Sequence, residues 1–159
     1  MKKALLVVLS LVFAVPVLVI TAALLFSVLF APKDPILASL PDYLTKEFYT
    51  CGGFQDSTDY AKYTYEVSES VFIHSPYFLR VSSVGTERFL TYLDNFENWV
   101  DTCEDFPAES YDFDRSVISE NDYFYILNRY EEPEMEFYSY NLYFFDLESQ
   151  TLYYFHNNI

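Results

Sequence analysis

The segment TERFLTYLDNFENWVDT, residues 86–102, has the clearest helical periodicity in the charged part of the chain. Its apolar side chains recur at i, i+4, i+7 and i+11, which places them on one face of an α-helix: Phe89, Leu93, Phe96 and Val100. Polar side chains fall on the opposite face: Glu87, Asp94, Asn98 and Asp101. The segment therefore predicts a long amphipathic helix with one face packed against another layer.

On the C-terminal side of this helix the apolar period changes to two. The alternation predicts four strands, over residues 113–118, 123–130, 137–147 and 151–156. Short polar connections between them favour antiparallel neighbours. The sequence thus predicts an α+β domain, in which an antiparallel sheet of four or five strands packs on the long helix.

On the N-terminal side the signals are weaker. A short helix is expected to begin near Pro41 and to end at the two glycines Gly52 and Gly53, with an apolar stripe of Leu40, Leu44 and Phe48. Residues 54–67 fit either a helix or a strand, and their density of Tyr and Thr favours the strand. Residues 71–79 are expected to form short irregular or strand pieces.

An uncharged apolar run over residues 4–31 follows Lys2 and Lys3. A bilayer core needs roughly 20 apolar residues as a helix, whereas a cleaved signal peptide has an apolar region of about 7–15 residues and a small-residue cleavage site. Both interpretations remain open, and the length of the run favours an uncleaved signal-anchor. Because basic residues stay on the cytoplasmic side, we expect a single-pass protein of the cell membrane with its N-terminus in the cytoplasm.

This topology divides the chain into four parts. Residues 1–3 would be a cytoplasmic stub, residues 4–31 a transmembrane helix in the lipid bilayer, and residues 32–40 a juxtamembrane spacer. Residues 41–159 would form a single extracytoplasmic domain, since they suffice for one hydrophobic core.

The charge of the chain is strongly acidic. All 24 Asp and Glu residues lie at or beyond Asp34, with only six Lys and Arg residues beside them, so this part has a formal charge of −18. Such a charge repels nucleic acid and favours cationic partners, and we expect a cationic protein or peptide partner. Aromatic residues make up 21% of the chain, which excludes a disordered acidic tail.

The two cysteines, Cys51 and Cys103, both fall in the expected extracytoplasmic part. An oxidising compartment permits a structural disulfide between them, which would close a loop of about 50 residues and stabilise the fold by about 4 kcal/mol. The alternative is two buried free thiols. The wide spacing matches neither a metal-ligand pattern nor a redox motif.

Acidic pairs and clusters raise the alternative of an anchored carboxylate- or metal-dependent hydrolase. Asp112 and Asp114 would share one side of a strand, as would Asp146 and Glu148. Two acidic clusters offer oxygen ligands for calcium: Asp101, Glu104, Asp105 and Glu109, and Glu131, Glu132, Glu134 and Glu136. The first cluster lacks the spacing of an EF-hand, and the second is most simply an exposed loop whose charge discourages edge-to-edge pairing of the sheet, so we assign no metal ligand and no cofactor.

Histidine is scarce, with His74 and His156 the only two. Neither lies in a recognisable nucleophile motif, and Ser75 beside His74 is adjacency in sequence alone, so we assign no catalytic residue. Each is better interpreted as a half-exposed histidine of a sheet or loop.

Three segments carry a resemblance: YDFDRSVISENDYFYI at residues 111–126, LYFFDLESQTLYYFHNNI at residues 142–159, and FQDSTDYAKY at residues 54–63. In them the chain resembles small membrane-anchored or exported proteins of Gram-positive bacteria that have no assigned function. The resemblance implies a bacterial source and an anchored or exported topology, and it brings no catalytic residue. We therefore expect a non-enzymatic binding module with an acidic, tyrosine-rich surface.

Overall fold

The computed structural model describes residues 16–17, 19–21, 34–53, 56–82, 85–103, 106 and 110–159. The chain divides into two compact units, residues 1–38 and residues 39–159. In the first unit, residues 16–17 and 19–21 are helical; the rest of the expected transmembrane segment 4–31 and the stub 1–3 lie outside the described residues. No helix in the described part of the chain has the length and apolar character needed to cross a membrane.

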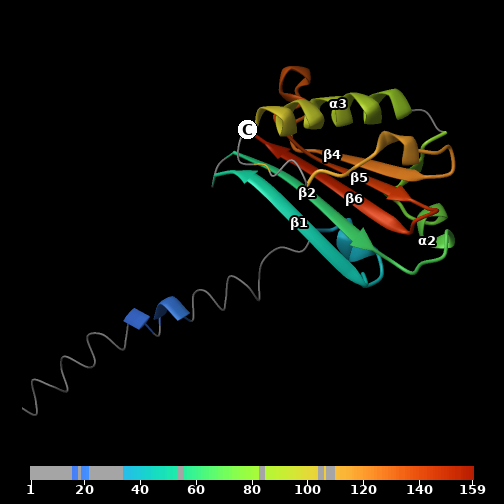
Figure 1. The fold of residues 1–159 in the computed structure, drawn as a ribbon, viewed down its shortest axis with the longest axis horizontal. Helices are drawn as coiled ribbons and strands as arrows, with labels where there is room; N and C mark the ends of the chain where they lie inside the picture. Colours follow the sequence, from blue (N-terminus) through green and yellow to red (C-terminus); the bar gives the residue numbers. More distant parts are fainter. Residues whose placement is uncertain are drawn as a thin grey trace, which may run out of the picture. The chain divides into compact units, whose positions relative to one another are not determined.

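The second unit is an α+β domain built on one antiparallel sheet (Figure 1). The sheet has six strands, rather than the four or five expected, in the order β1-β2-β6-β5-β4-β3. The strands are β1 (Thr45–Gly52), β2 (Ser57–Thr64), β3 (Leu79–Arg80), β4 (Tyr123–Asn128), β5 (Ser139–Asp146) and β6 (Thr151–Asn158). The predicted antiparallel pairing of the last three strands is confirmed.

Helix α3 (Thr86–Thr102) packs across one face of this sheet, as Figure 1 shows. Its bounds are those that the amphipathic pattern predicts, and its buried side chains are Phe89, Tyr92, Leu93 and Phe96. Gly85 precedes the helix with a φ of 117°, a left-handed conformation that glycine adopts without steric cost. Burial of each large apolar side chain contributes about 1.5–3 kcal/mol, so the packing of this one face holds the helix on the sheet.

The face of the sheet under α3, here called the helix face, contains the main core. Its fully buried side chains come from the four inner strands β2, β6, β5 and β4: Tyr60, Phe155, Tyr140, Leu142, Phe144 and Phe124. The opposite face, here called the far face, is covered at one end by the short helix α2 (Ser70–Ile73). There the ring of Phe72 stacks on that of Phe145 with centroids 4.0 Å apart.

The prediction of a helix that begins near Pro41 is wrong. Residues 45–52 instead form β1, which pairs with β2 along its whole length. The four-residue spacing of Leu40, Leu44 and Phe48 does not mark a buried stripe, because Leu44 and Phe48 are exposed. Thr45, Phe48, Tyr49 and Thr50 are residue types that favour a pleated strand, and the pairing with β2 decides between the two structures.

The prediction of a strand over residues 113–118 is also wrong. Phe113 is buried against Phe144 and Phe155, but the chain then forms a 3₁₀ turn at Arg115–Val117. The carboxylate of Asp114 accepts a hydrogen bond from the backbone N–H of Ser116 at 2.9 Å and so caps this turn. Such a local bond stabilises the turn at the expense of a strand. The strand favoured for residues 54–67 is confirmed as β2.

Candidate functional site

The paired acids considered for hydrolysis are engaged by the domain itself. Asp112 accepts hydrogen bonds from Lys62 Nζ at 2.6 Å and from the Tyr60 hydroxyl at 2.9 Å. Partial burial raises its pKa, but the bonds from Lys62 and Tyr60 outweigh this and hold the pKa of Asp112 below its ordinary value. Asp114 caps the turn described above, so the two carboxylates do not converge on one cleft.

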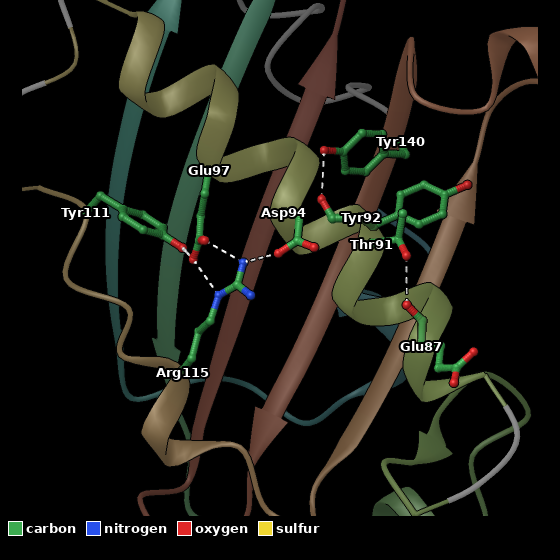
Figure 2. Close-up of polar contacts among 8 residues, drawn as sticks. All are labelled: Glu87, Thr91, Tyr92, Asp94, Glu97, Tyr111, Arg115 and Tyr140. Carbon is green, nitrogen blue, oxygen red and sulfur yellow. Dashed lines mark hydrogen bonds and ion pairs between the residues drawn. The ribbon is translucent and has the colours of Figure 1, made fainter.

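Acids on the exposed side of α3 hold the next segment in place (Figure 2). Arg115 donates to Asp94 Oδ1 at 2.6 Å and also pairs with Glu97, while the Tyr111 hydroxyl donates to Glu97 Oε1 at 2.8 Å. Burial, together with the Glu97 carboxylate, raises the pKa of Tyr111. These contacts tie residues 111–115 to the helix and have a structural role.

The remaining acidic candidates are similarly dispersed. Asp146 accepts from the backbone N–H of Glu148 at 2.9 Å and closes the β5–β6 turn. Glu136 accepts from Tyr92 at 2.9 Å and pairs with Arg88. In the first calcium candidate, Glu104, Asp105 and Glu109 lie outside the described residues. Among the residues that are described, no three Asp, Glu, His or Cys side chains gather as metal ligands.

The two histidines lie far apart in the fold, at different kinds of position. His74 follows α2 and is exposed, with Nδ1 at 2.8 Å from the carbonyl oxygen of Ser70. His156 lies on the far face in a row of cross-strand partners: Thr50, Asp59, His156, Asn141 and Leu127. Its Nδ1 lies 3.1 Å from the carbonyl oxygen of Tyr140 and 2.6 Å from Asn141 Oδ1. Because a carbonyl oxygen only accepts, Nδ1 carries the proton in the neutral ring.

Cys51 and Cys103 are joined in a disulfide, with Cα atoms 6.6 Å apart. The bond links the end of β1 to the residue that follows α3. It thereby fixes the distance between the edge of the sheet and the C-terminal end of the helix.

The exposed apolar side chains of this end of the domain gather around Trp99. Trp99 on α3, Tyr138 before β5 and Ile159 after β6 are 38%, 47% and 43% exposed. Local bonds hold them: the Ile159 N–H donates to the Tyr138 carbonyl at 2.8 Å, and the Thr102 hydroxyl donates to the Trp99 carbonyl at 3.0 Å. Three separate elements therefore contribute one apolar surface.

Two cavities flank the indole of Trp99, and Trp99 and Ile159 line both. The first, of about 240 Å³, extends to the disulfide and to Gly52 and Asp56 at the β1–β2 turn. The second, of about 310 Å³, is bounded by Phe137, Tyr138 and Asn95. We call these two cavities, with the side chains between them, the Trp99 groove.

The Trp99 groove is apolar with an acidic edge. Among the described residues that line it, Asp56 is the single charged side chain. Elsewhere in the domain, four of the six bases after Lys33 form ion pairs with its own acids: Lys62, Arg80, Arg88 and Arg115. The groove therefore presents apolar contact area on a domain of net negative charge.

No protein family model, curated protein or solved structure matches this chain.

Sequence patterns indicated tyrosine as the recognition residue, but seven of the 16 tyrosines are buried and seven more are partly buried. Of the 16 tyrosines only Tyr43 and Tyr138 are exposed, while Tyr60, Tyr92, Tyr140 and Tyr143 are fully buried. The sequence reading missed Trp99. One signal could have found it: Trp99 is the only Trp in the chain and follows Phe96 by three residues, at the border of the apolar stripe.

Proposed function

We propose that this protein is a membrane-anchored extracytoplasmic binding module, held by residues 4–31, that captures a cationic polypeptide segment in the Trp99 groove. The observation that carries the proposal is the exposure of Trp99, Tyr138 and Ile159 around two cavities in a domain, residues 39–159, of formal charge −17. Trp and Tyr dominate the binding energy of protein interfaces, because their large rigid surfaces lose little conformational entropy when bound.

Charge complementarity decides the chemistry of the partner. Asp56 at the edge of the groove, together with the net negative charge of the domain, attracts a segment rich in Lys or Arg and repels an acidic one. An apolar side chain of the same segment then fills a cavity beside the indole. A binding role also fits the engagement of Asp112, Asp114 and Glu97 in structural hydrogen bonds.

The test uses Trp99 as its own reporter, since it is the only Trp of the chain. Full-length protein in zwitterionic detergent is titrated with a ten-residue peptide of alternating Lys and Leu. We expect a saturable blue shift of the emission, weakened by salt, and no response to the matching Glu and Leu peptide.

Substitution then separates the groove from general charge attraction. Trp99→Ala should weaken the binding of a labelled Lys and Leu peptide by about tenfold or more, as expected for a central aromatic anchor. Ile73→Ala, at an exposed position on α2, is the matched control and should leave the affinity unchanged. Equal affinity of the wild type and Trp99→Ala, or equal binding of the basic and acidic peptides, would refute the proposal.

A further inference from the structure

Strand β1 forms a long open edge of the sheet. It is eight residues long and pairs with β2 on one side, and among the described residues no strand pairs with its other side. The opposite edge strand, β3, has only two residues. An edge of this length presents a row of unpaired backbone groups that can template a further strand.

The hydrogen bonds of β2 show which residues of β1 face outward. Directly after β2, the Tyr65 N–H donates to the carbonyl oxygen of Gln150, which precedes β6. Hydrogen bonds alternate in direction along an antiparallel strand, so the odd-numbered residues of β2 bond to β6 and the even-numbered residues bond to β1. The Gly53 N–H donates to the Asp56 carbonyl at 2.8 Å, so the odd-numbered residues of β1 are the ones that bond to the even-numbered residues of β2. The backbone N–H and C=O groups of Lys46, Phe48 and Thr50 therefore point away from the sheet.

The edge has only part of the usual protection against added strands, since Lys46 and Glu47 are exposed but β1 is long and has no proline. Proteins guard edges with outward charges, proline or very short strands. In β1, Glu47 is paired with Lys62 of β2 at 3.0 Å, and the Lys46 ammonium lies over the Phe48 and Tyr63 rings at 5.0 and 5.3 Å. Both charged groups thus have partners within the domain. The apolar side chains of Phe48 and Leu44 are 48% and 65% exposed.

We propose that an extended cationic segment adds to this edge as a seventh strand, antiparallel or parallel to β1. The inference rests on the proposed function for the chemistry of the partner, but it uses a different surface. A second copy of the chain is disfavoured as the occupant because it would bring two domains of formal charge −17 together. The edge is also continuous with the Trp99 groove, because Cys51 and Gly52 at the end of β1 line that groove. One cationic segment could therefore occupy both surfaces.

Backbone pairing is tested at Phe48, whose N–H points outward. Phe48→Pro removes this donor and leaves the β1–β2 ladder intact, because proline is tolerated on an edge strand where its nitrogen faces solvent. Phe48→Thr is the matched control, since it also removes the ring but keeps the N–H and the strand propensity. We expect Phe48→Pro to bind the Lys and Leu peptide about tenfold more weakly than Phe48→Thr. Circular dichroism and thermal unfolding check that both variants fold.

Hydrogen exchange of the unmodified full-length protein gives a second, independent measurement. The amides of Lys46, Phe48 and Thr50 should exchange more slowly when the peptide is bound. Equal affinities of the two Phe48 variants, or unchanged exchange at these three amides, would overturn the strand addition. If Trp99→Ala still weakens binding in that case, the groove stands and only the seventh strand fails.

The same experiment identifies a second copy as the occupant. If the three amides become protected without peptide as the protein concentration rises, and sedimentation shows a dimer, the edge pairs with itself and the cationic segment is excluded. Loss of strand pairing in Phe48→Pro with full binding by Trp99→Ala would instead confirm the edge and refute the groove.

Discussion

His156 is a histidine whose charge state the sheet controls. Its Nδ1–H is directed at the Tyr140 carbonyl and at Asn141 Oδ1, while Asp59 faces it from β2. Burial lowers the pKa of His156, and the Asp59 carboxylate and the Tyr140 carbonyl only partly oppose this. The folded domain therefore favours the neutral ring.

This environment predicts a pH dependence of stability. Because the pKa of His156 is lower in the folded state than its ordinary 6.5, the stabilisation is complete above pH 6.5 and is lost as the pH falls through the folded-state pKa. When the pH is lowered from 7.5 to 5.5, the urea midpoint of unfolding should fall more for the wild type than for His156→Gln.

His74→Gln, at an exposed position, serves as the control and should follow the wild-type curve. Parallel losses in the wild type and His156→Gln would show that other groups cause the acid sensitivity.

Single residues also show where sequence reasoning stops. Trp99 and Phe96 are three residues apart on the same helix, yet Phe96 is fully buried and Trp99 is 38% exposed. Helical periodicity locates the face, but the border of that face depends on how far the sheet beneath extends. Tyr43 and Tyr138 are also exposed, and no local pattern separates them from the buried tyrosines.

The link between β1 and α3 makes a second prediction, at the level of elements. Replacing both Cys51 and Cys103 by Ser opens a loop with a sequence separation of 52 residues. The free energy of unfolding should fall by about 4 kcal/mol, since the unfolded chain gains the conformations that the bond excluded. Equilibrium unfolding in urea, with and without reductant, measures this loss.

Reductant should destabilise the wild type and leave the double Ser variant unchanged. An unchanged midpoint of the reduced wild type would mean that the packing of α3 alone holds the end of β1.

Secondary structure was predictable where burial is periodic and local. The helix over residues 86–102 and the strands β4, β5 and β6 each have an apolar pattern of their own. β1 does not, because four of its first five side chains are exposed and its pairing with β2 determines its conformation. At residues 113–118 one capping carboxylate, Asp114, outweighed a weak alternation.

For the whole molecule, the proposed anchor predicts where the intact chain is found. Expressing cells should retain an 18.7 kDa protein in the membrane fraction, with both thiols open to alkylation only after reduction. Intact mass spectrometry of membrane and medium, before and after reduction, measures both properties. A shortened chain in the medium would contradict the anchor and leave the binding module to be tested as a secreted domain.

The order of the strands lies beyond sequence reasoning of this kind. Alternation identified β2 and β6, but nothing local indicates that Tyr60 pairs with Phe155 across 95 positions of the chain. Turn lengths predict neighbours only for consecutive strands, such as β5 and β6. The Trp99 groove follows from this order, because Ile159 reaches Trp99 through the central place of β6.

The central place of β6 also sets the timing of folding on the ribosome. Residues 151–158 are the last strand to be synthesised, yet they join the β1–β2 hairpin to β5 and the rest of the sheet. A nascent chain therefore carries the hairpin without its neighbouring strand while about ninety further residues are added, and the six-stranded sheet is completed only when β6 emerges. The pairing of the hairpin with the rest of the sheet is therefore the last step of assembly, and the open side of β2 has no partner strand until then.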